Sequence, residues 1–337
     1  MTERALPIID IAPLREMADE AAIKSAAASI SEACRTFGFF YAEGHGIPDA
    51  LFDRMEADSR RFFSLPEADK AAIGMEKGGT AWRGWFPLGG ELTSDLPDRK
   101  EGLYLGEELG PEDPRVQARW PLHGANLWPT QVPQLRNSVN DYVLAARATA
   151  EALMRGMALA LGLPAQYFAA GLTSQPTLLF RIFRYPPDDG SPSFGVGEHS
   201  DYGLLTLLGQ DANGGLEVRA EDGEWISVPP RGRALVVNVG DMFERLTRGR
   251  FRSAPHRVIN TSGRERYSYP LFFDPAFAQP VDPLPVPVKQ ARHTRARWDG
   301  VDLHEKEMRT YGDYLLNKIS KVFPELADRE LSIAPLG

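Results

Sequence analysis

Residues 175–275 consist of short apolar segments that alternate with turn signals, and this pattern constrains the fold more than any other feature of the chain. Pro-Pro, Asp-Gly, Asn-Gly-Gly and Gly-Asp sequences separate the segments, which we predict to be strands. The predicted strands are 177–185, 204–208, 216–219, 225–228, 234–239, 256–260 and 266–273. Short strands at this spacing are typical of a β-sandwich or barrel and not of a sheet built from βαβ units.

Helical periodicity surrounds this strand-rich region. Apolar residues recur at helical intervals over 14–36, 49–63, 130–162 and 303–321, and compact apolar runs at 37–41 and 102–106 indicate further strands. The chain has no internal repeat, low-complexity tract or clear linker, so we predict one domain over residues 1–337, mostly β with surrounding helices. Its predicted parts are a mixed α/β region (1–125), a long-helix region (126–174), a β core carrying the site (175–275) and a C-terminal extension with a helix (276–337).

Composition limits the partners of the chain. A net charge of −8 over 337 residues argues against nucleic acid or an anionic membrane surface as a partner, because both attract basic proteins. The single cysteine, Cys34, excludes an internal disulfide and a cysteine-based zinc cluster. No apolar run approaches the ~20 residues of a membrane span, and the N-terminus lacks a signal pattern. We therefore predict a cytoplasmic protein, and its oligomeric state stays open.

A candidate metal site lies within the strand-rich region. His199 and Asp201 are two residues apart, so on a strand their side chains would project to the same face. His256, on a later predicted strand, would add a second imidazole. Two neutral nitrogens and one carboxylate form the facial triad of non-heme Fe(II) oxygenases, which leaves open coordination positions opposite. Arg266 follows His256 by 266 − 256 = 10 positions.

The segments around these residues resemble the isopenicillin N synthase-like family of Fe(II)/2-oxoglutarate-dependent oxygenases nearly end to end. The segments that carry the resemblance are Leu6-Pro7-Ile8-Ile9-Asp10, Gly38-Phe39-Phe40, Gly44-His45-Gly46-Ile47, Arg184-Tyr185-Pro186-Pro187, His199-Ser200-Asp201-Tyr202-Gly203, Gly214-Gly215-Leu216, Val237-Asn238-Val239-Gly240-Asp241, Pro255-His256-Arg257-Val258, Arg266-Tyr267-Ser268 and Tyr311-Gly312-Asp313-Tyr314. The resemblance implies a double-stranded β-helix (jelly-roll) core, an Fe(II) ion inside it, and 2-oxoglutarate and O₂ as cosubstrates.

Charge balance suggests how 2-oxoglutarate would be held. Fe(II) with two imidazoles and one carboxylate keeps a charge of about +1, and the dianionic cosubstrate would leave about −1 in a barrel interior. Arg266 can neutralise the distal carboxylate through two parallel hydrogen bonds, and Ser268 shares its strand face and can donate another. Many relatives carry Asn-Tyr-Tyr where this chain has Phe183-Arg184-Tyr185. In those relatives the Asn and the second Tyr are associated with the C1 end of the cosubstrate, and Phe183 cannot form a hydrogen bond there. The resemblance therefore implies that the C1 carboxylate relies on Tyr185 or on Arg181, and the sequence leaves both open.

Strand parity extends the site towards the primary substrate. Counting by twos from Arg266 places Phe272 and Asp274 on the inner face, where the family contacts its substrate. Asp274 is either a polar substrate contact or a cap for the turn before Pro275. Leu205 shares parity with His199 and is predicted to add apolar wall, while the aromatic residues Phe183 and Tyr104 suit either a substrate pocket or the core.

The sequence thus predicts an enzyme that couples oxidative decarboxylation of 2-oxoglutarate to succinate and CO₂ with oxidation of a small organic substrate. The oxidation would be a hydroxylation or a desaturation, and ring closure stays possible. An Fe(II) oxidase or cyclase that works without 2-oxoglutarate is the alternative, because Arg-x-Ser also occurs in some of these enzymes. A jelly-roll binding protein without catalytic activity is disfavoured by the complete triad, and a halogenase by Asp201, since halogenases lack the carboxylate ligand.

Overall fold

The structure is a computed structural model that describes residues 4–187, 194–287, 303, 309–324 and 327–328. The strands of its large sheet are β1 (Ile8–Asp10), β2 (Phe39–Glu43), β3 (Gly84–Phe86), β6 (Glu101–Gly106), β7 (Thr177–Tyr185), β9 (Leu205–Gln210), β12 (Leu235–Val239) and β14 (Arg266–Asp274). A smaller sheet contains β8 (Val196–His199), β10 (Leu216–Arg219), β11 (Trp225–Ser227) and β13 (His256–Val258). Strands β4 (Leu92–Thr93) and β5 (Leu96–Pro97) form a separate two-stranded sheet.

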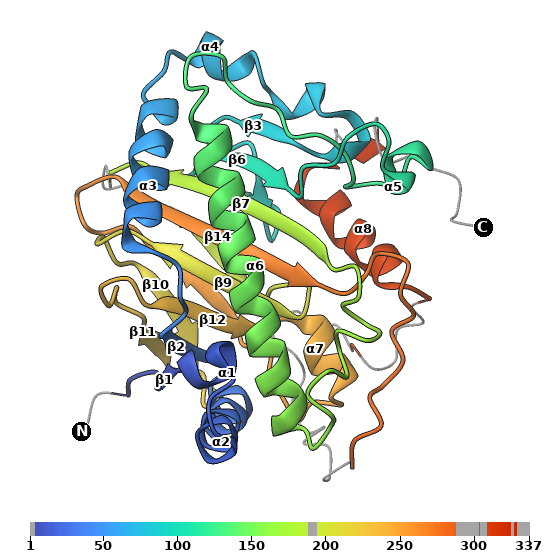
Figure 1. The fold of residues 1–337 in the computed structure, drawn as a ribbon. Helices are drawn as coiled ribbons and strands as arrows, with labels where there is room; N and C mark the ends of the chain where they lie inside the picture. The colour runs from blue at the N-terminus through green and yellow to red at the C-terminus, as the bar shows by residue number, and fades with distance from the viewer. Residues whose placement is uncertain (1–3, 188–193, 288–302, 304–308, 325–326, 329–337) are drawn as a thin grey trace.

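The two sheets form the predicted jelly-roll core. The large sheet runs in the order β1-β2-β12-β9-β14-β7-β6-β3, and the smaller sheet in the order β11-β10-β13-β8. Sequence neighbours such as β8 and β9 lie in different sheets, so the chain crosses repeatedly from one layer to the other (Figure 1). Residues of both sheets line one cavity between the layers. The predicted fold class, mostly sheet with helices around a jelly roll, is confirmed.

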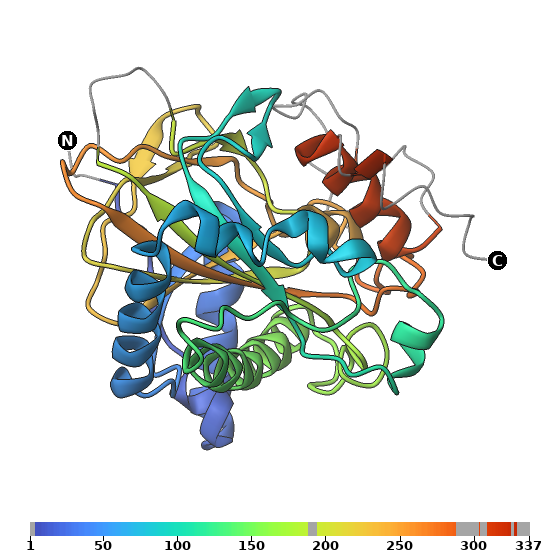
Figure 2. The same ribbon diagram turned by 90° about the horizontal axis from the view of Figure 1, so that it is seen from above.

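Helices pack around the sheets, and several of them cover the outer face of the large sheet. They are α1 (Ala12–Glu16), α2 (Glu20–Thr36), α3 (Asp49–Phe63), α4 (Glu67–Ala71), α5 (Pro114–Gln117), α6 (Leu135–Ala160), α7 (Asp241–Leu246) and α8 (Tyr311–Val322). Helix α6 crosses that face beside α3, whereas α8 lies at one end of the barrel (Figures 1 and 2). Within the described residues no helix is long and apolar enough to cross a membrane.

Alternation along β14 separates the helix-covered face from the cavity. Tyr267 meets Phe63 of α3 edge to face, with ring centroids 6.0 Å apart, so the odd-numbered side chains face the helices. Arg266, Ser268, Pro270, Phe272 and Asp274, the even-numbered residues, all line the cavity. The parity predicted from the sequence for this strand is therefore confirmed, because a strand directs successive side chains to opposite faces.

Some element boundaries differ from the predictions for local reasons. The helix predicted over 14–36 is two helices, because Met17 adopts a left-handed conformation (φ 53°) and Asp19 then caps α2 by accepting from two backbone N–H groups. Strand β2 begins only after Gly38, whose φ is 71°. Helix α7 was not predicted. Strand β8 was not among the predicted strand ranges, although the site argument placed His199 and Asp201 on a strand.

The C-terminal helix is shorter than the sequence suggests. Its predicted range was 303–321, of which residues 304–308 lie outside the described part of the chain. Helix α8 begins at Tyr311 because Thr310 forms a capping box with Asp313, in which each side chain accepts from the other residue's backbone N–H. The predicted long helix begins at Leu135, five residues later than expected from 130.

Candidate metal centre and its cavity

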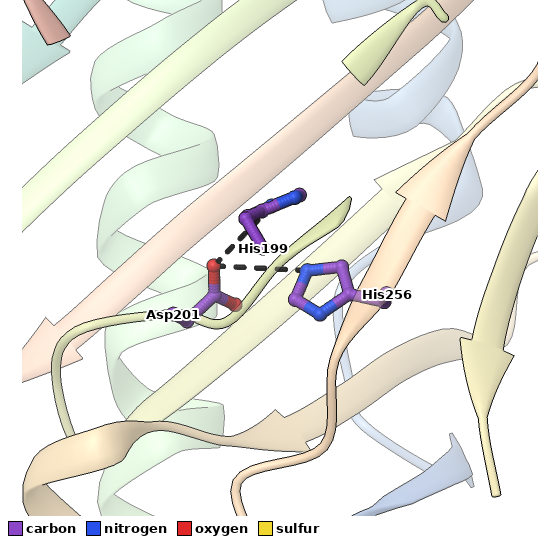
Figure 3. A group of neighbouring side chains, drawn as sticks. All are labelled: His199, Asp201 and His256. Atoms are coloured by element: carbon purple, nitrogen blue, oxygen red, sulfur yellow. Dashed lines mark ion pairs between the residues drawn. The ribbon is translucent and has the colours of Figure 1, made fainter. Parts of the chain in front are cut away.

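Three predicted ligands meet between the two sheets. His199 ends β8 and His256 begins the neighbouring strand β13, where the two residues are directly paired, and Asp201 follows β8 by two residues. Asp201 Oδ1 lies 4.0 Å from His199 Nε2 and 3.8 Å from His256 Nε2 (Figure 3). The candidate ligand atoms all lie within 4.8 Å of one another. This spacing brings all three atoms within reach of one ion.

Backbone carbonyls orient both imidazole rings. His199 Nδ1 lies 2.8 Å from the Gly197 carbonyl oxygen, and His256 Nδ1 lies 3.2 Å from that of Ala254. A ring that donates from Nδ1 keeps the Nε2 lone pair for a metal. Burial lowers the pKa of His256 to about 4, so this ring is neutral at physiological pH. Both properties suit a metal ligand.

Two polar neighbours orient the Asp201 carboxylate. Its Oδ2 accepts hydrogen bonds from Thr206 Oγ1 at 2.5 Å and from Asn238 Nδ2 at 2.7 Å, which leaves Oδ1 facing the imidazoles. Burial alone would raise the pKa of Asp201, but the two imidazoles and these hydrogen bonds lower it below its usual value. Asn238 lay in one of the family-like segments without an assigned role, and no sequence signal pointed to Thr206. Two imidazole nitrogens and one carboxylate form a ligand set that fits Fe(II).

The chain path between Asp201 and β9 overturns one sequence prediction. His199 and Asp201 do not share a strand, because β8 ends at His199 and the chain then crosses to the other sheet. The crossing resets the parity, so Thr206 and Leu208 line the cavity. Leu205 is not among the described residues that line it, and the predicted wall position of Leu205 is wrong.

The cavity that starts at the metal group has a volume of about 390 Å³. Most of the predicted cosubstrate and substrate residues line it, namely Arg181, Phe183, Tyr185, Arg266, Ser268, Phe272, Asp274 and Tyr104. Several lining residues were not predicted, among them Trp82, Glu91, Lys100, Tyr202, Leu315, Lys318 and Phe323. Trp82, Glu91 and Lys100 come from the Gly- and Trp-rich segment before β6, and Leu315, Lys318 and Phe323 come from α8 and its C-cap, where no motif distinguishes pocket residues from core residues. Tyr202 lies in the family-like segment that follows His199.

The Arg266 guanidinium is buried, and the described residues do not accept all of its N–H donors. Its side chain is fully buried, and Nη2 donates to Gln210 Oε1 at 3.2 Å. Nε and Nη1 have no hydrogen-bond partner among the described residues. Nearby, Tyr185 Oη lies 3.3 Å from Ser268 Oγ, and the guanidinium carbon lies 4.7 Å from the centre of the Tyr185 ring. Because buried N–H groups are normally satisfied, this arrangement fits a bound carboxylate.

Arg181 is a second buried guanidinium in the same wall. Its Nη1 donates to the backbone carbonyls of Leu105 and Phe180, both at 3.1 Å, and its carbon lies 3.5 Å from the centre of the Tyr104 ring. Burial lowers the pKa of Arg181. The guanidinium carbon of Arg181 lies 5.8 Å from the centre of the Phe272 ring, whereas Arg266 precedes Phe272 by six residues on β14. The Arg181 and Arg266 guanidinium groups therefore lie beside different parts of the cavity.

Asp274 receives hydrogen bonds from two other parts of the chain. Its Oδ1 accepts from the Leu204 N–H at 3.2 Å and its Oδ2 from the Tyr311 hydroxyl at 2.5 Å. Asp274 thus joins the end of β14 to the loop before β9 and to α8. Each carboxylate oxygen already has a donor, which favours an anchoring role. The predicted substrate contact of Asp274 stays a prediction.

We expect Asp274→Ala to destabilise the protein. The change leaves the Leu204 N–H and the Tyr311 hydroxyl without their acceptor, which costs about 1–3 kcal/mol per buried group. Thermal denaturation measures the loss. Comparing substrate-coupled turnover with uncoupled 2-oxoglutarate decay separates the two roles: an equal loss in both supports anchoring, and a selective loss of coupled turnover supports a substrate contact.

The stability of the metal-free protein should also depend on Asp274 ionisation. Burial raises the pKa of Asp274 to about 7, well above its ordinary value. A folded-state pKa above the unfolded value gives a stabilisation that is complete below the unfolded pKa and is lost as pH rises through about 7. Relative to Asp274→Asn, the wild type should lose about 2–3 kcal/mol between pH 5 and 7. Urea denaturation of both proteins at the two pH values tests this, and parallel pH profiles would contradict it.

Comparison with known proteins identifies the chain. The family described as non-haem dioxygenase in morphine synthesis N-terminal matches residues 6–131, and the 2OG-Fe(II) oxygenase superfamily matches residues 176–275. The second match covers the three candidate ligands together with Arg266 and Ser268.

Individual relatives agree with these matches. The Dictyostelium discoideum protein named "Probable iron/ascorbate oxidoreductase" is 43% identical over 98% of this chain and 98% of its own length. A homoarginine-6-hydroxylase of Oryza sativa is 33% identical over 94% of this chain and 97% of its own. The crystal structure of a Neurospora crassa protein in complex with α-ketoglutarate and thymine has a TM-score of 0.77 at 26% identity, over 94% of this chain and 96% of that one. The chain therefore belongs to the 2OG-Fe(II) oxygenase superfamily, and it is an enzyme that uses Fe(II), 2-oxoglutarate and O₂ to oxidise a small substrate.

Proposed function

We propose that His199, Asp201 and His256 hold the Fe(II) ion and that Arg266 and Ser268 bind the distal carboxylate of 2-oxoglutarate. The observation that carries this proposal is the Arg266 guanidinium, fully buried with two N–H groups that no described residue accepts. A carboxylate would satisfy both groups and balance the buried charge. Tyr185, beside Ser268 and under the guanidinium, completes the proposed site.

When bound at this centre, Fe(II) would allow O₂ to oxidise the substrate while 2-oxoglutarate is converted to succinate and CO₂. The residues of the chain prepare for that chemistry. Backbone carbonyls hold both imidazoles with Nε2 towards the ion, and Thr206 and Asn238 fix the rotation of the Asp201 carboxylate. Residues of both sheets and of α8 line the cavity that would hold the reacting atoms.

For the C1 carboxylate of 2-oxoglutarate we propose Arg181, because Tyr185, the other candidate from the sequence, lies beside Ser268 at the proposed distal site. Arg181 lines the cavity and has no carboxylate within 4.0 Å in the described part of the chain. Phe183 cannot donate a hydrogen bond, although it lies between the two candidates on β7. A buried cation without an anionic partner is costly, so an anionic ligand group beside it would stabilise the occupied site.

The primary substrate is proposed to lie against Tyr104, Phe183, Phe272 and Asp274, all of which line the cavity. Relatives act on compounds of suitable size, since one is named for homoarginine and one structure contains thymine. A cavity of about 390 Å³ accommodates a molecule of that scale beside the cosubstrate. We propose hydroxylation or desaturation as the reaction on this substrate.

Anaerobic titration tests the cosubstrate site directly. Adding 2-oxoglutarate to the Fe(II)-loaded protein should produce a charge-transfer absorption, and admitting O₂ should yield succinate. A metabolite screen for compounds that accelerate succinate release would then identify the substrate. Substrate oxidation without succinate formation would favour the 2-oxoglutarate-independent oxidase or cyclase instead.

We also propose that the chain is organised as one domain. Strands from the 1–125 region, such as β2 and β6, pair with β12 and β7 of the 175–275 region in the large sheet, which supports a single folding unit. The cytoplasmic location and the lack of a nucleic-acid partner stay predictions from composition.

A further inference from the structure

Glu91 is a buried carboxylate in the cavity wall that neither the metal centre nor the proposed cosubstrate site uses. It is 9% exposed and lines the cavity. The Tyr104 hydroxyl donates to its Oε1 at 2.6 Å, which fixes the rotation of the carboxylate. Its Oε2 is buried and lies 3.0 Å from Lys100 Nζ, its ion-pair partner. Oε1 can accept a second hydrogen bond, because a carboxylate oxygen has two lone pairs and Tyr104 uses one of them.

The charges of Glu91 and of the two side chains in its ion-pair group do not cancel. Lys100 is buried and also pairs with Asp98, so one ammonium serves two carboxylates. Asp98 is occupied by other donors, because it accepts from the Thr93 hydroxyl at 2.7 Å and from the Gly197 N–H at 3.2 Å. The three side chains together carry a charge of −1, and Glu91 is the carboxylate of the pair that lines the cavity. A buried excess charge of this kind is stabilised by a counter-charge.

Aromatic rings surround the same part of the wall. Tyr104 and Phe323 pack edge to face with centroids 5.6 Å apart, and Trp82 meets Phe323 at 6.0 Å. All three residues line the cavity. Arg181 already lies over the Tyr104 ring, and the proposed C1 carboxylate of the cosubstrate offsets its charge. Aromatic faces attract organic cations, and the attraction is larger where water is excluded. The wall thus combines an excess carboxylate with aromatic rings, and both features favour the same kind of ligand.

We infer that Glu91 selects a primary substrate that carries a nitrogen cation, either an ammonium or a guanidinium group. The N–H group of that cation donates to the Glu91 carboxylate while the aromatic rings cover its apolar part. The inference rests on the proposed function, because it assigns the substrate end of the same cavity. Glu91 would be a specificity-determining residue that acts at a distance from the metal ligands.

Paired probes test the charge preference. L-arginine, L-homoarginine and L-lysine supply the cation, while L-citrulline and L-norleucine are neutral counterparts of similar shape. Each is titrated into anaerobic Fe(II)–2-oxoglutarate protein, and the change in charge-transfer absorption gives its affinity. We expect at least one cationic probe to bind at least tenfold more tightly than the neutral probes. Glu91→Gln, which keeps the size and an acceptor oxygen, should abolish that preference.

Asp95→Asn is the matched control, because Asp95 is an exposed acid that lines the same cavity and the change removes the same charge. The 2-oxoglutarate affinity of each variant is measured first, so that a loss of probe binding can be distinguished from a loss of cosubstrate binding. The inference is overturned if the neutral probes bind the wild type as well as the cations do, if no probe binds, or if Glu91→Gln keeps the preference. An equal loss in Asp95→Asn would also overturn it. Failure of the wild type to bind 2-oxoglutarate would instead contradict the proposed function.

Discussion

Asp201→Ala should abolish substrate oxidation and reduce Fe(II) binding to a small fraction of the wild-type stoichiometry. The change removes one of three ligands and the negative charge that balances the ion. It also leaves the Thr206 hydroxyl and the Asn238 amide without their acceptor at the centre of the barrel. No other carboxylate within the described residues forms a metal-ligand group with the two imidazoles. We therefore expect Asp201→Ala to lose catalytic activity as well as affinity for Fe(II).

Metal analysis and thermal denaturation measure this outcome independently of activity. Fe(II) binds the folded state, so adding it should raise the melting temperature of the wild type and leave that of Asp201→Ala nearly unchanged. Asp201→Glu keeps the charge on a longer side chain and should retain some metal binding with poor turnover. Full iron stoichiometry with undiminished turnover in Asp201→Ala would refute the ligand assignment.

The sequence predicted the parts of the fold that depend on local periodicity. Strand β14 illustrates this, since its length and two-residue alternation placed Arg266, Ser268, Phe272 and Asp274 on one face, and all four line the cavity. Short strands whose partners are distant were harder to predict. Strand β8 has only four residues, and it exists because it pairs with β13 across the site. Nothing in its own composition indicates that pairing.

The same contrast holds for the site. The three candidate ligands and Arg266 stand in distinctive local sequences, so motif spacing sufficed to propose them, and the structure places all four around one cavity. Thr206 and Asn238 hydrogen-bond to Asp201 only because β9 and β12 are neighbours in the large sheet, where Asn238 pairs directly with Thr206. The error at Leu205 has a related cause, because alternation predicts facing only within one strand and the chain changes sheets between Asp201 and β9. Contacts of this kind follow from tertiary structure alone.

The Arg266→Leu variant should bind 2-oxoglutarate at least about a hundredfold more weakly than the wild type. Removing one partner of a buried, hydrogen-bonded charge pair costs ~3–5 kcal/mol, and ~1.4 kcal/mol corresponds to a factor of ten in affinity. Fe(II) should still bind, because none of the three candidate ligands is changed. Titrating 2-oxoglutarate anaerobically and following its charge-transfer absorption gives the affinity.

Arg266→Lys separates the contribution of charge from that of geometry. Lysine keeps the positive charge, but it cannot offer two parallel N–H donors to one carboxylate, so its affinity should lie between those of the wild type and of Arg266→Leu. Gln210 Oε1 would also lose its Arg266 donor in the leucine variant. If Arg266→Leu bound 2-oxoglutarate as tightly as the wild type, the distal carboxylate would have to be held elsewhere. Arg181, the other guanidinium that lines the cavity among the described residues, would then be the residue to change next, because it can supply the same charge from β7.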